Sequence, residues 1–161
     1  MSEIKRIKSQ LRRAFEGEAW HGPSVLELLK DVTAEQAAAH PVAGAHSIWE
    51  LALHITTWER YTRRRIVEAS ALEPTDEENF PTVRDTSKQA WRATVEELKR
   101  NHAELLETVA GLDDAKLSEI VAGKPYSVYF MLHGVIQHDL YHAGQIALLK
   151  KASSSGPSDF H

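Results

Sequence analysis

Apolar residues recur every three or four positions through most of the chain, and nowhere do they alternate over the length of a strand. A helix repeats about every 3.6 residues and a strand every two. The clearest run has steps of four, three, four, three and four residues, at Trp91, Val95, Leu98, His102, Leu105 and Val109. The pattern therefore predicts an all-α protein.

Two long helices are predicted in the N-terminal half. The first covers residues 4–32 and should kink or break at Trp20-His21-Gly22-Pro23, because proline lacks an N–H and clashes with the preceding turn. The second starts at the capping box formed by Ser47 and Glu50 and runs to about residue 69. Short helical turns are also predicted over residues 34–39, where Thr33 and Gln36 form a second capping box, and up to residue 121, starting at Asp113 or Asp114.

Two more long helices follow. Thr82 and Asp85 together suggest the start of one, which ends at Gly111, and the other covers about residues 126–152. The connection over residues 70–81 is polar and long enough to cross a bundle rather than form a tight hairpin. We expect a four-helix bundle with short additional helices and a long crossover loop. It should form a single domain over residues 1–152, followed by a polar C-terminal tail over residues 153–161.

Composition excludes several functional classes. The net charge of −4 argues against non-specific nucleic-acid binding, which needs cations to displace counterions from phosphate. There is no cysteine, so thiolate metal sites and nucleophilic thiols are excluded. No signal-peptide core and no apolar stretch near the roughly 18 residues of a membrane span is present. A cytoplasmic protein without membrane partners is expected.

The last predicted helix, over about residues 126–152, is apolar on almost every side. Such a helix is buried all round, or it is buried against both its own bundle and another subunit. We expect the chain to form a homodimer through this helix.

Three histidines are candidate metal ligands. His138 and His142 stand four residues apart, so both rings lie on one helix face and can bind one ion. A third ligand must come from another helix, and His54 is the best candidate because it lies beside the apolar stripe of the second helix. Three neutral imidazoles leave coordination positions open, as in catalytic sites. They suit a divalent transition metal, with no choice indicated between Ni, Zn, Fe and Mn.

Five further residues are candidates for the pocket or for contacts with the ligand rings. Glu50 and Gln145 each lie about one turn from a candidate ligand, and Trp58 is placed to form a pocket wall. His21 either lines the pocket mouth or only belongs to the helix break. His102 is better interpreted as a hydrogen-bonded core or pocket residue than as a fourth ligand. No catalytic residue is identified.

Asp139 lies between the two histidines of HDLYH, a string that invites comparison with the HExxH metalloproteases. Its side chain is shorter than glutamate, and no third ligand follows downstream. We expect Asp139 to contact solvent or another subunit instead.

Two segments carry a family resemblance: IWELALHITTWE, residues 48–59, and HGVIQHDLYHAGQIALLKK, residues 133–151. They resemble the DinB-like, or YfiT-like, superfamily of DNA-damage-inducible four-helix-bundle proteins, which are regarded as metal-dependent enzymes. AWHGPSVLELL, residues 19–29, resembles one branch of it. The resemblance implies a bundle fold, assigns the metal ligands to His54, His138 and His142, and implies a dimer. Some members conjugate or isomerise small molecules with low-molecular-weight thiols.

Two alternative functions follow. The first is a metal-dependent enzyme that acts on a small-molecule substrate, with thiol-dependent transferase or hydrolase-like chemistry and a low-molecular-weight thiol as cosubstrate. The second is a non-catalytic metal-binding stress-response protein that acts as a dimer. An enzyme should have a cleft beside the open metal positions, whereas in a binding module the ion should be shielded.

Overall fold

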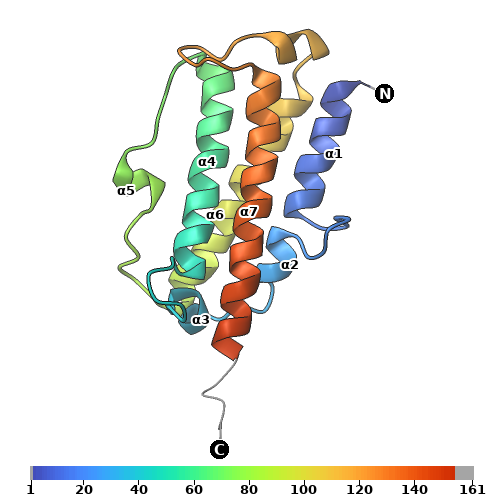
Figure 1. Ribbon diagram of the computed structural model, residues 1–161. Coiled ribbons are helices and arrows are strands. Elements are labelled where there is room, and N and C mark those ends of the chain that lie inside the picture. The colour runs from blue at the N-terminus through green and yellow to red at the C-terminus, as the bar shows by residue number, and fades with distance from the viewer. Residues whose placement is uncertain (1, 155–161) are drawn as a thin grey trace, which may run out of the picture.

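The computed structural model describes residues 2–154, and this range is helical apart from its connections, with no strand (Figure 1). Four long helices form the bundle: α1 (Glu3–Phe15), α4 (Ile48–Glu68), α6 (Lys88–Ala110) and α7 (Val128–Ser154). The connections carry the short helices α2 (Val25–Leu29), α3 (Ala34–Ala38), α5 (Asp76–Asn79) and the 3₁₀ helix η1 (Asp114–Ser118). The predicted all-α bundle is confirmed.

The chain crosses the bundle once between α4 and α6. These two helices run in the same direction, and α1 and α7 run in the opposite direction (Figure 1). The connection over residues 69–87, which includes α5, therefore returns along the outside of α4 to the other end of the bundle. Each of α4 and α1 packs against both α6 and α7. The predicted crossover is present, and it brings α5 to the side of α4.

Capping boxes fix the start of several helices. At α4, Glu50 N donates to Ser47 Oγ (3.1 Å) and Ser47 N donates to Glu50 Oε2 (2.7 Å), as the sequence predicts. Thr33 and Gln36 cap α3 in the same way. The predicted break near Pro23 is also present, because α1 ends at Phe15 and α2 starts only after Ser24.

The helix start predicted from Thr82 and Asp85 is wrong, because α6 begins at Lys88. The N-cap is Ser87, whose Oγ accepts from Ala90 N at 3.1 Å. Asp85 accepts a hydrogen bond from Ser87 N at 2.9 Å and so stabilises the turn before the helix.

The ends of α7 also differ from the prediction. Its first residue is Val128 rather than Tyr126, because Val121 N donates to Tyr126 O (3.0 Å) and Val128 N donates to Glu119 O (2.9 Å) in a bridged turn. At the other end, α7 continues through Ser154, so residues 153 and 154 are helical rather than part of the expected tail. The rest of that tail, residues 155–161, lies outside the described residues.

Two apolar clusters fill the bundle, one toward each end. One contains Leu98 and Ile146, and the other contains Leu105 and Leu132. Between them on the same helices lies a layer of buried polar side chains, contributed by Thr56 and Glu59 of α4, Asn101 and His102 of α6, and Asp139 and His142 of α7. Burying polar side chains inside a bundle costs free energy unless they are hydrogen-bonded or bind a ligand. This layer is therefore where a functional site is expected.

One face of α7 is exposed rather than buried all round. Phe130, Tyr141 and Leu148 are large apolar side chains with more than half of their surface accessible, at 63%, 67% and 67%. Within the described part of the chain, none of the helices combines the length and apolar character needed to cross a membrane.

Candidate metal centre

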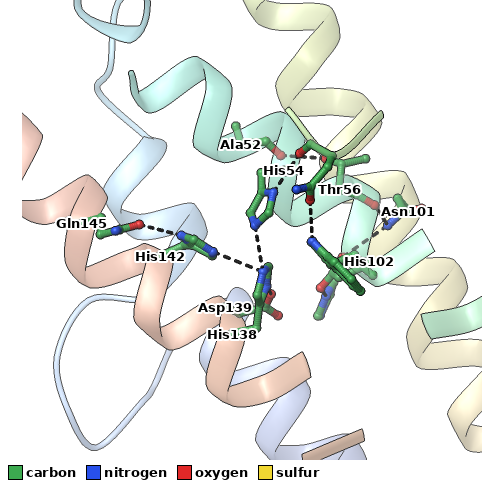
Figure 2. A network of polar contacts seen from close by, with 12 residues as sticks. Ala52, His54, Thr56, Asn101, His102, His138, Asp139, His142 and Gln145 are labelled. Atoms are coloured by element: carbon green, nitrogen blue, oxygen red, sulfur yellow. Dashed lines mark hydrogen bonds and ion pairs between the residues drawn. The ribbon is translucent and has the colours of Figure 1, made fainter. Parts of the chain in front are cut away.

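Three imidazole rings meet between α4 and α7, those of His54, His138 and His142 (Figure 2). His138 Nε2 lies 3.0 Å from His54 Nε2 and 3.1 Å from His142 Nε2. His54 and His142 are buried and His138 is partly buried. Nitrogens at these separations are spaced as ligands of one ion are, since two ligands at about 2.0–2.1 Å from Zn²⁺ lie about 3–3.5 Å apart.

The outer nitrogens of two rings fix their tautomers. His54 Nδ1 donates to the backbone oxygen of Asn79 at 2.8 Å, and His142 Nδ1 donates to Gln145 Oε1 at 2.6 Å. Both acceptors lack a proton to give, so both rings carry their proton on Nδ1 and present a lone pair on Nε2. His138 could donate to only one of these lone pairs. One Nε2 lone pair is therefore left without a hydrogen-bond donor, and a cation at the centre of the three Nε2 atoms would interact with it.

The three histidines are neutral at physiological pH. Burial lowers the pKa of His54 from 6.5 to about 4 and the pKa of His138 from 6.5 to about 3, and it also lowers the pKa of His142. The proximity of the other two rings contributes to the low pKa of His138. Metal ligands must be deprotonated, so protons do not compete with a metal for these rings near pH 7.

Residues of the crossover orient His54, and sequence reasoning missed them. Besides the bond from His54 to Asn79 O, Trp58 Nε1 donates to Asn79 Oδ1 (2.9 Å) and Thr57 Oγ1 donates to Glu78 O (2.7 Å). Phe80 stacks on the His54 ring with centroids 4.1 Å apart. The sequence did carry a signal for the short helix in this crossover, because Thr75 and Glu78 form the capping box that starts α5.

Gln145 is the residue for which the sequence expectation and the geometry agree most closely. Its side chain accepts from His142 Nδ1 and holds the ring so that Nε2 points to the other histidines (Figure 2). Such partners of ligating histidines set the ring orientation and raise its basicity.

Replacing Gln145 with leucine is therefore expected to weaken metal binding about 10–100-fold, the usual cost of losing such a partner. Competition of the variant with a chromophoric chelator for Zn²⁺ measures the change. Gln137→Leu on the exposed side of α7 is the matched control and should bind like the unmodified protein. Equal affinity of Gln145→Leu and the control would show that this hydrogen bond has no role at the site.

The other candidate residues lie at different distances from the histidines. Trp58 is adjacent: its ring centroid is 6.0 Å from that of His138. Glu50 caps α4 and contacts His40 (3.2 Å) and His46 (3.4 Å), and it has no hydrogen bond to the three histidines. His21 lines a separate cavity of about 180 Å³ beside α1 and α7.

His102 is a hydrogen-bonded core residue. Its Nδ1 lies 2.6 Å from Glu59 Oε1, and its ring stacks on Phe15 with centroids 3.8 Å apart. Asn101 Nδ2 donates to Thr56 O (3.2 Å) and reaches Glu59 Oε2 (3.4 Å) (Figure 2). Glu59 has no exposed surface, and sequence reasoning did not single it out.

The expectation that Asp139 contacts solvent or a subunit is wrong. Its side chain is fully buried beside His102 and Glu59, and its carboxyl group interacts with that of Glu59. Burial raises the pKa of Asp139 well above its ordinary value, and the nearby Glu59 raises it further. Asp139 is therefore a buried acid in the core, next in sequence to His138, and not a surface carboxylate.

Glu59 gives the fold a pH dependence. Burial raises its pKa from 4.5 to about 8, so between these values the folded protein holds a proton that the unfolded chain has released. Its contribution to the free energy of unfolding is fully present below about pH 4.5 and is lost as the pH rises through 8. Burial lowers the pKa of His102 from 6.5 to about 4, which has the opposite effect below pH 6.5.

Glu59→Gln removes the titrating proton, and we expect this variant to lose less stability than the unmodified protein between pH 6.5 and 8. Urea unfolding of both proteins at the two pH values, with chelator present, measures the difference. Parallel losses in the two proteins would mean that Glu59 is already ionised in the fold.

Two cavities lie near the histidine group, and one of them is lined by His138. One, of about 250 Å³, lies between α4 and α7 and is lined by both Trp58 and His138. The other, of about 270 Å³, is lined by His46, Gln145 and Leu148. None of the three histidines lines the largest cavity described, about 820 Å³ between α2, α3 and α6.

The fold and the site define a class: a helical bundle with three inward-facing histidines on two of its helices. The family model of the DinB superfamily matches residues 19–146, most of the chain. The chain belongs to the DinB superfamily, as the resemblance of its histidine-containing segments indicated. Comparisons with curated proteins and with solved structures gave no match. Family membership and the buried histidine group are compatible with a metal-binding enzyme.

Proposed function

We propose that this chain is a metal-dependent enzyme that acts on a small molecule, with a divalent transition metal held by His54, His138 and His142. The single observation that carries the proposal is the convergence of the three Nε2 atoms, two of them fixed as lone pairs by Asn79 and Gln145. A divalent ion held by three neutral imidazoles supplies Lewis acidity that can acidify a water or thiol or polarise a carbonyl.

The cavities favour the enzyme over the alternative of a non-catalytic metal-binding protein. A metal held only for structure or signalling needs no room beside it, whereas catalysis requires access to open coordination positions. The space lined by Trp58 and His138 provides such access. Trp58, held by Asn79, forms its wall and keeps a bound molecule beside the histidines.

The second cavity supports a reaction with two participants. It is lined by Gln145, which contacts His142, while the first cavity is lined by His138. A low-molecular-weight thiol in one space and an electrophile in the other would give transferase chemistry. Water in place of the thiol would give hydrolysis. The chain itself has no cysteine, so any thiol must come from solution.

The test is a screen of the protein loaded with Zn²⁺, Ni²⁺, Fe²⁺ or Mn²⁺ against small thiols paired with electrophiles, and against esters alone. The proposal expects at least one metal-dependent reaction that chelation removes. Retained metal with no accelerated reaction across the panel would favour the non-catalytic module.

We also propose a homodimer through α7. Gln137, Tyr141, Gly144 and Leu148 follow one another at steps of four, three and four residues, and all are exposed. This is the spacing by which one helix packs along another, and a side chain added at Gly144 would meet nothing within 4 Å.

Leu148→Glu is expected to convert the dimer to a monomer, because it would place charges in the apolar contact. Analytical ultracentrifugation of the unmodified protein should give about twice 18.1 kDa, and the variant about 18.1 kDa. A monomeric unmodified protein at micromolar concentration would contradict the dimer.

A further inference from the structure

The 250 Å³ cavity beside the histidines has a polar residue at its other end. Its lining includes Trp58, Thr62 and Arg65 of α4 and Phe130, Gly134 and His138 of α7, which lie side by side (Figure 1). His138 is level with Trp58, and Arg65 is level with Tyr126 just before α7, since Arg65 Nη1 donates to the Tyr126 hydroxyl at 3.3 Å. The cavity therefore runs along the two helices from the histidines to Arg65.

Arg65 is unusual for an arginine in a bundle, because only 3% of its side chain is exposed. Its Nε donates to Leu72 O (2.8 Å), and its Nη2 donates to Glu73 (2.8 Å). With the bond to Tyr126, three of the five N–H groups are used, which leaves one on each terminal nitrogen. Its guanidinium also lies over the Trp58 ring, 5.6 Å from the ring centroid.

The charge at this end of the cavity is positive. Glu73 is the acid that contacts Arg65, and it also contacts Lys124. Two cations therefore share one carboxylate, and about half of the Glu73 side chain faces solvent, where water screens its charge. A buried arginine with free N–H groups and incomplete neutralisation suits a carboxylate, which it can bind with two parallel hydrogen bonds.

The walls between the two ends are apolar. Trp58, Phe130, Met131 and Val135 supply them, and Gly134 leaves room because an added Cβ would meet nothing within 4 Å. Arg65 lies seven positions after Trp58, a rise of about 10 Å along the helix. The volume is below the roughly 300–1,000 Å³ of sites for drug-sized ligands, so the fitting molecule is small.

We propose that this cavity is the substrate site and that the substrate is a small apolar carboxylate. Its carboxylate binds Arg65, its aliphatic or aromatic body lies against Trp58 and Phe130, and its far end reaches His138. The inference rests on the proposed function for the role of the histidines. The carboxylate site itself does not depend on a metal, so the two can be tested separately.

The experiment compares phenylbutanoate with phenylbutanol, which share a body and differ in the charged end. Dissociation constants come from tryptophan fluorescence of the full chain, because Trp58 lines the cavity. Chelator is present, so that a carboxylate bound to metal cannot be mistaken for one bound to Arg65. Zn²⁺ retention is measured on a chelator-free sample of the same preparation.

The acid should bind the unmodified protein at least about tenfold more tightly than the alcohol, as charge-assisted hydrogen bonds predict. Arg65→Met should remove this preference and leave binding of the alcohol within about twofold, since only the charged end of the ligand loses its partner. Equal binding of acid and alcohol to the unmodified protein, or a preference that survives Arg65→Met, overturns the inference.

Gly134→Leu keeps the test decisive if Arg65→Met does not fold. A leucine there fills the cavity without removing any hydrogen bond, and it should weaken both probes at least about tenfold. Ala103→Leu is the control, because it adds a leucine at an exposed position of α6 that does not line this cavity. Unchanged binding by Gly134→Leu overturns the site. If the unmodified protein prefers the acid over the alcohol but does not retain Zn²⁺, only the proposed metal function is overturned.

Discussion

His138→Ala is expected to lower metal affinity by more than about 100-fold, so that the purified variant retains no metal after dialysis. His138 Nε2 is within 3.1 Å of both other Nε2 atoms, so its ring is the central member of the group. Loss of a residue that only orients a ligand costs about 10–100-fold, and loss of a ligand costs more. Elemental analysis after loading with Zn²⁺ or Ni²⁺ measures the metal retained for each chain.

The control is His133→Ala, which removes a histidine from the same helix. His133 lies one to two turns before His138, packs against Tyr129 and is absent from the group. Circular dichroism of both variants checks that the helices persist. The assignment fails if His138→Ala retains as much metal as His133→Ala.

Metal loading is expected to raise the thermal unfolding midpoint by about 8–16 °C at a free metal concentration 1,000 times the dissociation constant. Binding only to the folded state adds about 4.1 kcal/mol under these conditions, and each kcal/mol is worth about 2–4 °C for a domain of this size. The ligands come from α4 and α7, so an ion would join two helices that the unfolded chain leaves apart.

Calorimetric scans with excess Zn²⁺ and with chelator measure this shift, and the same scans on His54→Ala provide the control. The variant should show only the small shift caused by weak sites elsewhere. An equal rise in the unmodified protein and in His54→Ala would mean that the stabilising metal binds somewhere else.

Local spacing made much of the site predictable. His138 and His142 are one turn apart on one helix, so their convergence follows from helix geometry alone. His54 could be selected because it borders the apolar stripe of α4 and therefore faces the bundle. Gln145 was predictable for the same local reason, since it lies one turn beyond His142.

Contacts made across the crossover were not predictable in this way. Asn79 and Phe80 reach His54 only because residues 69–87 fold back along α4, and no periodicity encodes where an irregular segment docks. The buried acids were missed for a related reason. Glu59 and Asp139 appear on their helices as ordinary charged residues, and their burial depends on partners from α4, α6 and α7 meeting in one layer.

The most direct measurement is X-ray absorption spectroscopy of the Zn²⁺-loaded protein, which reports the number and kind of atoms around the ion. We predict three imidazole nitrogens at about 2.0–2.1 Å together with at least one exchangeable oxygen ligand. A spectrum with fewer than three imidazoles, or a closed set of protein ligands without an exchangeable position, would contradict the account.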